Sequence, residues 1–146
     1  MAAPLLEVED LRVHFDTEDG LVKAVDGISY TVDRGETLGI VGESGSGKSV
    51  SALTLMGLTP RLNTTFEGTA TLEGQDLLNA TDDELRRLRG EKIAMIFQDP
   101  MTSLNPVQRI GGQIVEQIQA HRDMGSKEAY DLTVELLERV GIPRVR

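Results

Sequence analysis

The chain has 146 residues, of which 39% are hydrophobic, and it carries a net charge of -9 from 24 acidic and 15 basic side chains. This length suits one domain of ordinary size with a real core, while the acidity argues against a nucleic-acid-binding surface, which needs clustered Lys and Arg. The absence of cysteine excludes disulfides and thiolate metal sites within these residues.

Neither a membrane-spanning segment nor a secretory signal is visible in the sequence. No apolar run approaches the roughly 20 residues that a membrane-spanning helix needs. The N-terminus Met1-Ala2-Ala3-Pro4 lacks the basic start and apolar centre of a signal peptide. We therefore expect a cytoplasmic protein without direct membrane insertion, unless a partner holds it at a membrane.

The first part of the chain predicts an antiparallel sheet. Apolar and polar residues partly alternate from Leu5 to Phe15, and the following polar stretch ends in the turn dipeptide Asp19-Gly20. The extended pattern resumes over Leu21–Val25 and Ile28–Val32. Two strands joined by a turn are the simplest structure with this pattern.

A glycine-rich loop connects an expected buried strand, Glu36–Val41, to an expected helix, Lys48–Leu58. The loop reads Gly42-Glu43-Ser44-Gly45-Ser46-Gly47-Lys48-Ser49 and fits the Walker A pattern G-x-x-x-x-G-K-[ST]. Glycines let the backbone wind around phosphates, and the helix presents its positive end to the same anion. The pattern predicts that Lys48 neutralises the β- and γ-phosphates of a nucleotide and that Ser49 offers its hydroxyl to the accompanying Mg²⁺. The alternative is a chance Gly/Ser linker.

The middle of the chain alternates short elements with turns. Gly68–Leu72 predicts a short strand and Gly74 a turn. Thr81-Asp82-Asp83-Glu84 has the form of a capping box that opens a short helix, and Gly90 is placed to end it. The continuous apolar run Ile93–Phe97 predicts a strand buried on both faces.

Two amphipathic helices are expected beyond Pro100. Apolar residues recur at helical spacing over Ile110–Arg122, and Ser126 is the expected N-cap of a second helix that runs to Val140. The change from strands to helices places a subdomain boundary within Asp99–Val107. The apolar faces of these helices have no visible partner.

The segment Gln98–Pro106 carries the resemblance to a known family. It reads Gln-Asp-Pro-Met-Thr-Ser-Leu-Asn-Pro, follows the expected buried strand and resembles the Q-loop of ABC-transporter ATPases. More narrowly, Phe97–Pro100 and Ser103–Pro106 resemble the ATP-binding subunits of dipeptide and oligopeptide importers, to which Leu5–Val41 is similar as well. The resemblance covers essentially the whole chain.

The resemblance implies an α/β fold of the P-loop NTPase class, of the ABC type and truncated, with an N-terminal antiparallel β subdomain and the start of a helical subdomain. Residues 1–98 would form a partial nucleotide-binding core with the Walker A loop and the Q-loop glutamine, and residues 99–146 the beginning of the α-helical subdomain. It implies ATP binding and, in the complete protein, ATP hydrolysis that energises peptide transport across the cytoplasmic membrane.

The site residues that the resemblance implies can be placed on this sequence. Gln98 matches the glutamine whose side chain reaches Mg²⁺ and the attacking water, so Lys48 and Gln98 are the candidate catalytic residues, and Ser49 and Gln98 the candidate Mg²⁺ ligands. Phe15 matches an aromatic residue that stacks on adenine. The candidate ATP-binding residues are Phe15, Gly42, Glu43, Ser44, Gly45, Ser46, Gly47, Lys48, Ser49 and Val50.

The resemblance also implies partners. Asp99–Gln108 would line the groove that receives membrane-spanning permease subunits, and a second ATPase subunit would complete a dimer. Such a protein lies at the inner face of the cell membrane.

The family's LSGGQ-like motif, its strand ending in Asp-Glu and its switch histidine do not occur before Arg146, and His14 and His121 stand elsewhere. We therefore expect no hydrolysis by this chain alone. Two alternatives remain: another P-loop NTPase or kinase that uses Asp99 for Mg²⁺, and a truncated, non-catalytic product that competes for the membrane subunit.

Overall fold

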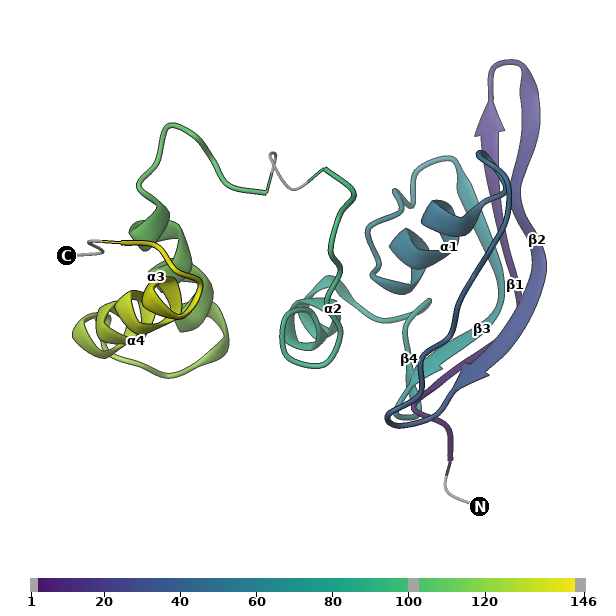
Figure 1. Cartoon of the computed structure of the whole chain (residues 1–146). Coiled ribbons are helices and arrows are strands. Elements are labelled where there is room, and N and C mark those ends of the chain that lie inside the picture. The colour runs from purple at the N-terminus through teal and green to yellow at the C-terminus, as the bar shows by residue number, and fades with distance from the viewer. Residues whose placement is uncertain (1–2, 100–102, 144–146) are drawn as a thin grey trace. The chain divides into compact units, whose positions relative to one another are not determined.

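The computed structural model describes residues 3–99 and 103–143, which fall into two compact units, Met1–Arg89 and Gly90–Arg146. Figure 1 shows the elements along the chain. They are β1 (Leu6–Thr17), β2 (Gly20–Val32), α1 (Lys48–Leu55), β3 (Thr64–Leu72), β4 (Gln75–Asp76), α2 (Asp82–Leu88), α3 (Ile110–His121) and α4 (Ser126–Arg139).

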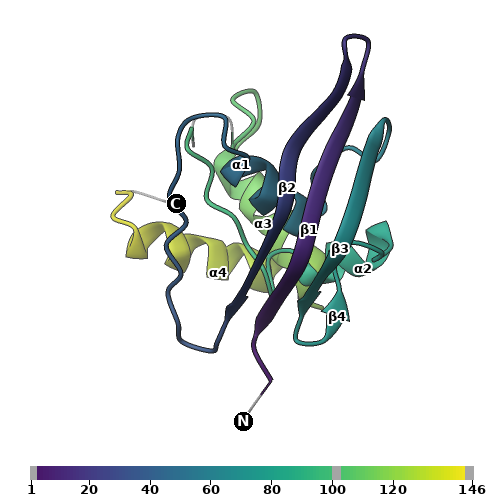
Figure 2. The same cartoon turned by 90° about the vertical axis from the view of Figure 1, so that its right-hand side faces the viewer.

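The first unit is built on a four-stranded antiparallel sheet with the strand order β2-β1-β3-β4 (Figure 2). β1 and β2 form the predicted hairpin, in which Thr17 pairs with Gly20 and the Thr17 hydroxyl donates a 2.7 Å hydrogen bond to the Gly20 carbonyl. β3 begins at Thr64, four positions before the expected Gly68. The predicted antiparallel sheet is confirmed, and β2 is one of its edge strands.

A bulge in β1 keeps the apolar side chains of this strand on one face. The pairing of β1 shifts register between Val8 and Leu11 on the β2 side, and Asp10 adopts a φ of 45°. Because side chains alternate between faces, a residue inserted at this point brings both Val8 and Leu11 to the inner face, where both are buried. Gly68 on β3 accommodates the bulge, since a Cβ there would lie 2.3 Å from the Asp10 carbonyl oxygen.

Helix α1 covers the inner face of the sheet where β1 and β2 run side by side (Figure 1). Leu55 of α1 is buried together with Val13 and Val25 of the two strands. The helix ends at Leu55 and not at the expected Leu58, because Gly57 takes a left-handed φ of 63° and turns the chain.

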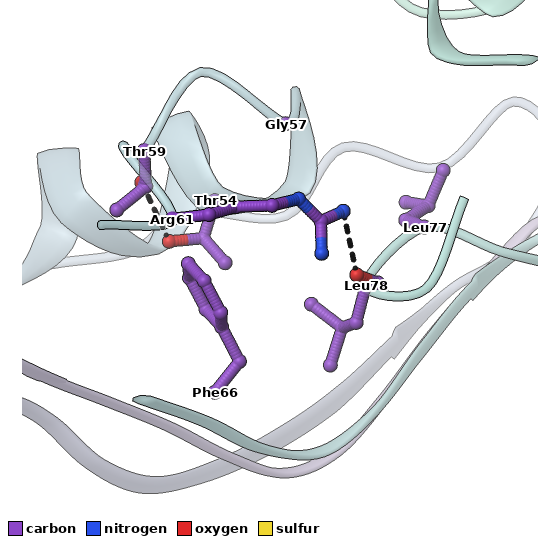
Figure 3. A pocket seen from close by; sticks show the side chains of 7 residues that line it. All are labelled: Thr54, Gly57, Thr59, Arg61, Phe66, Leu77 and Leu78. Carbon is purple, nitrogen blue, oxygen red and sulfur yellow. Dashed lines mark hydrogen bonds between the residues drawn. The ribbon is translucent and has the colours of Figure 1, made fainter. Parts of the chain in front are cut away.

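Hydrogen bonds of two arginines connect the chain after α1 with the chain after β4. Arg61 donates to the carbonyl oxygens of Leu78 and Ala80 at 3.0 and 3.1 Å, and Figure 3 shows its side chain crossing a small pocket. Arg89, just after α2, donates to the carbonyl oxygens of Met56 and Gly57, both at 2.8 Å. The pocket beside Arg61 has a volume of only about 10 Å³, room for about one water molecule, so it belongs to the packing between these segments and is not a ligand site.

The predicted capping box opens α2. The Thr81 hydroxyl accepts a hydrogen bond from the Glu84 N–H at 3.3 Å, and the Glu84 carboxylate accepts one from the Thr81 N–H at 2.8 Å. The bond from the Thr81 N–H, together with one that the Thr81 hydroxyl donates to the same carboxylate at 2.8 Å, holds the pKa of Glu84 below its ordinary value of 4.5.

The second unit contains α3 and α4, which pack against each other. Ala129, Thr133 and Val134 of α4 are buried, whereas α3 has no fully buried residue. The prediction that Ser126 caps α4 is wrong, because the helix already includes Ser126 and its N-cap is Gly125 without a side-chain bond.

Two further predictions are wrong: within the described residues neither 36–41 nor 93–97 forms a strand. Val41 is 94% exposed and Ile96 95% exposed. A strand exists only where a neighbour satisfies its backbone groups, and the sheet in the described part of the chain joins β1, β2, β3 and β4, while Ile93 is only an isolated bridge residue. An apolar run thus indicates an affinity for burial but does not supply the partner strand. Among the described residues, no helix is long and apolar enough to cross a membrane.

The capping box makes a testable prediction. Thr81→Ala removes the acceptor for the Glu84 N–H and should lower the free energy of unfolding by about 1 kcal/mol at pH 7. Because the folded-state pKa of Glu84 is depressed, its contribution is present above pH 4.5 and is lost as the pH falls through the folded-state value. Urea titrations at pH 7 and at pH 3 measure both effects, with Thr81→Ser as the control that keeps the cap. Equal unfolding free energies for the Ala and Ser variants would contradict the prediction.

Candidate functional site

The glycine-rich loop has the backbone form of an anion cradle. Gly45 and Gly47 adopt φ values of 83° and 89°, a left-handed conformation that glycine reaches without steric cost. Alternation of left- and right-handed residues turns successive N–H groups toward one centre. Helix α1 starts at Lys48, with no side chain capping its N-terminus and no acidic residue in its first turn. Its free N–H groups and positive dipole end therefore remain available to an anion.

The loop is seated against the edge of the sheet at Gly47. A Cβ atom on Gly47 would lie 2.1 Å from the Ala24 carbonyl oxygen of β2 and 3.4 Å from Val25 Cγ2. The β1–β2 pairing shifts register between Val13 and His14, so that Ala24 is the extra residue of β2 at this point. The last glycine of the loop is therefore required by its contact with β2 as well as by its φ.

The ammonium of Lys48 lies within the loop. Nζ donates to the carbonyl oxygens of Gly42 and Glu43, both at 2.7 Å, and to Ser46 Oγ at 3.2 Å. Ser51 donates its hydroxyl to the Lys48 carbonyl oxygen at 2.8 Å and thereby ties the first turn of α1. A phosphate oxygen is a stronger acceptor for an ammonium than a neutral carbonyl, so an anion can take over these bonds.

A cavity of about 420 Å³ lies between the loop and β2, a volume within the range of small-molecule sites. Its lining combines one stretch of the edge strand with the loop and the start of α1. The lining residues are Lys23, Ala24, Val25, Asp26, Ile28, Ile40, Val41, Gly42, Gly45, Ser46, Gly47, Lys48 and Ser51.

Asp26 is the centre of the charged groups beside this cavity. Its carboxylate lies 3.0 Å from Arg12 Nη1, 3.5 Å from Lys23 Nζ and 3.6 Å from His14 Nε2. Desolvation alone would raise the pKa of Asp26, but the charges of Lys23 and Arg12 outweigh it and hold the pKa below the ordinary value. Asp26 is therefore ionised at neutral pH and retains two cations next to the loop.

The structure brings together part of the predicted site. Gly42, Gly45, Ser46, Gly47 and Lys48 line the cavity. Of the other loop residues, Glu43, Ser44 and Ser49 are exposed, and Val50 is half-buried in α1.

Of the other predicted residues, Phe15 is not among those that line the cavity. Phe15 is half-buried near the end of β1, where it pairs with Val22 of β2 and Thr64 of β3. Gln98 is exposed and belongs to the second unit. Sequence reasoning missed the contribution of β2, above all Lys23 and Asp26, because no local pattern signals that this edge strand lies beside the loop.

Comparison with known proteins defines the class and then the family. The fold is that of a P-loop NTPase of the ABC type. It matches the structure of the ATP-binding cassette MJ0796, a dimer in a post-hydrolysis state bound to ADP and Pi. The match has a TM-score of 0.71 and 22% sequence identity, and it covers 91% of this chain and 56% of that one. The ABC transporter family model matches residues 25–145. The chain belongs to the ABC transporter family.

The relatives in sequence are longer than this chain. It is 50% identical over 145 residues to the oligopeptide transport ATP-binding protein OppD of Escherichia coli, covering 99% of this chain and 43% of the relative. The identity to OppD of Salmonella typhimurium is 52% over 142 residues, with 97% and 42% coverage. For OppD of Bacillus subtilis it is 49% over 140 residues, with 95% and 39%. The chain thus spans less than half the length of these relatives.

The two left-handed glycines of the loop give a matched pair of variants. Gly45→Ala meets no atom within 4 Å and should lose only the cost of a left-handed alanine, about 1–2 kcal/mol of unfolding free energy. Gly47→Ala suffers the same strain and also drives its Cβ into the Ala24 carbonyl. It should therefore be clearly the less stable of the two in thermal or urea unfolding. Equal stabilities would show that the contact with β2 does not constrain the loop.

Proposed function

We propose that this chain binds ATP together with Mg²⁺ through Gly42–Ser49, and that the complete protein uses ATP hydrolysis to drive peptide transport. The observation that carries the proposal is the position of Lys48, whose ammonium is held inside a glycine loop at the uncapped N-terminus of α1. The names of the relatives, which are oligopeptide transport ATP-binding proteins, point to the same activity.

Different residues of the loop would contact different groups of the nucleotide. Lys48 exchanges its bonds to the loop for bonds to the β- and γ-phosphates, and the N–H groups of the loop and of the first turn of α1 bind the same oxygens. Ser49, exposed at the first turn of α1, offers its hydroxyl to Mg²⁺. Glu43 and Ser44 of the loop and Val50 of α1 are the remaining residues that we propose to contact ATP. The magnesium ion supplies positive charge that offsets the negative charge of the phosphates.

The cradle fits this ligand on physical grounds. The close approach of Gly47 to β2 and of Gly42 to Ser46 leaves backbone where side chains would otherwise stand. Phe15 is the proposed adenine-stacking residue, and its half-buried ring near the end of β1, opposite Val22, leaves part of its surface for a base. Gln98 is the proposed Q-loop residue that binds Mg²⁺ and orients the attacking water.

The partners are proposed on the same basis. Residues 1–98 would form the partial nucleotide-binding core and residues 99–146 the start of the helical subdomain. A second ATPase subunit would complete a dimer, since the structural neighbour is dimeric. Membrane-spanning permease subunits would bind at Asp99–Gln108, and the protein would then lie at the inner face of the membrane.

The described part of that segment has the character of a docking surface. Leu104 is 44% exposed, and the neighbouring backbone is fixed by Gln113 of α3, which accepts from the Asn105 N–H at 2.8 Å and donates to the carbonyl oxygens of Asn105 and Gln108 at 3.0 and 3.2 Å. A cavity of about 690 Å³ beside it is lined in part by Leu104, Ile114 and Leu136. An exposed apolar side chain on a fixed backbone suits a protein contact.

The nucleotide proposal is tested at Lys48. Lys48→Ala removes a charge-assisted contact and should weaken ATP–Mg²⁺ binding by about 1.5–3 kcal/mol. Isothermal titration calorimetry measures the affinity, and Lys127→Ala on α4 is the control for loss of one positive charge. Equal affinity of the wild type and Lys48→Ala would refute the proposal, as would a wild type that does not bind.

The docking proposal is tested in the full-length protein. Met101, the other apolar residue that we propose for this contact, lies outside the described residues, so Leu104 carries the structural argument. Leu104→Ser together with Met101→Ser should leave ATP affinity unchanged but reduce peptide uptake into reconstituted vesicles relative to ATP hydrolysis. Leu62→Ser, at an 82% exposed leucine outside this segment, is the control. Normal uptake by the double variant would show that the segment is a linker and not a docking surface.

A further inference from the structure

The residues that line the cavity at the glycine loop include a lysine that is not part of the Walker A pattern. Lys23 of β2 lines the same cavity as Lys48. Its side chain is 53% exposed and its Nζ lies 3.5 Å from Asp26 Oδ2, three residues further along the strand. Lys23 and Lys48 are the two basic side chains among the described residues that line this cavity.

The order of contacts along β2 places Lys23 between the two ends of a bound nucleotide. Val22 pairs with Phe15, the proposed adenine-stacking residue, and Ala24 contacts Gly47 of the phosphate loop. Lys23 stands between these positions. It pairs with His14 and so its side chain leaves the sheet on the other face from Phe15, but β2 is an edge strand, and Lys23 is among the residues that line the cavity at this edge.

The present partner of Lys23 does not hold it strongly. An ion pair between two half-exposed side chains contributes little, so redirecting the ammonium costs little. Asp26 would not be left without a cation, because Arg12 remains 3.0 Å away. The need for positive charge is real, since a chain with a net charge of -9 otherwise repels a polyanionic ligand.

We propose that Lys23 is a further nucleotide-contacting residue, which leaves Asp26 and donates to the α-phosphate of ATP. The part of a nucleotide between its base and its β-phosphate is the ribose and the α-phosphate, and the phosphate is the anion that an ammonium selects. The inference rests on the proposed ATP binding at Gly42–Ser49 and adds to it a contact from the sheet.

Calorimetric titration of the 146-residue chain with ATP–Mg²⁺ and with ADP–Mg²⁺ tests the proposal. Lys23→Gln should weaken both ligands by the same factor, about 3- to 10-fold for one exposed charge-assisted contact, because the α-phosphate is common to both. Lys23→Arg should retain most of the affinity, since it keeps the charge. Arg86→Gln is the matched control: Arg86 is an exposed cation of the same unit, paired three residues away with Asp83, and does not line the cavity. Circular dichroism shows whether each variant is folded.

The outcomes separate this inference from the proposed function. If Lys48→Ala weakens ATP binding while Lys23→Gln behaves like Arg86→Gln, the inference is wrong and the proposed function stands. A loss with ATP but not with ADP would assign Lys23 to the γ-phosphate and overturn the α-phosphate contact, and failure of Lys23→Arg to restore affinity would overturn a role through charge. A folded wild-type chain that binds neither nucleotide would overturn both proposals.

Discussion

The contact between Gly47 and the Ala24 carbonyl of β2 is the constraint on which the site depends. It joins the hairpin of β1 and β2 to a part of the chain that is remote in sequence, the glycine-rich loop with the start of α1. A side chain at Gly47 would separate the loop from the sheet, because the space for its Cβ is taken by backbone. The position of Ala24 depends in turn on the register shift between β1 and β2, so the loop can take this position only because the strands are irregular here.

Electrostatics in this protein are local. The chain as a whole is acidic, and its mean field opposes an anion. The loop overcomes this with groups that act at contact distance, namely the Lys48 ammonium and the N–H groups at the start of α1. The negative charge of Asp26 would by itself repel an anion. Its carboxylate, however, lies close to Arg12, Lys23 and His14 and so keeps cations at the rim of the cavity. A carboxylate near the proposed phosphate site can thus serve to position positive charge.

Local patterns predicted local structure well. The turn predicted at Asp19-Gly20, the capping box at Thr81 and the start of α1 at Lys48 each depend on a few neighbouring residues. The structure contains the last two, and its hairpin turns one residue earlier, at Glu18-Asp19. Patterns that depend on a distant partner failed: the apolar runs 36–41 and 93–97 predicted buried strands, but a strand needs a neighbour that no run encodes. The β2 side of the cavity was unpredictable for the same reason, because it arises from the packing of an edge strand against the loop.

The absence of a strand before the loop changes what orders the loop. Residues 36–41 join no ladder in the described structure, so nothing in the sheet fixes the chain that enters at Gly42. The entry is held instead by Lys48, which bonds the carbonyl oxygens of Gly42 and Glu43, while the exit is held by Gly47 against β2. A phosphate that takes over the Lys48 ammonium therefore releases the entry and leaves the exit in place. Hydrogen bonds from the N–H groups of the loop to the phosphate would then supply the order that Lys48 gave, so under the proposed function the loop is the element whose conformation responds to nucleotide.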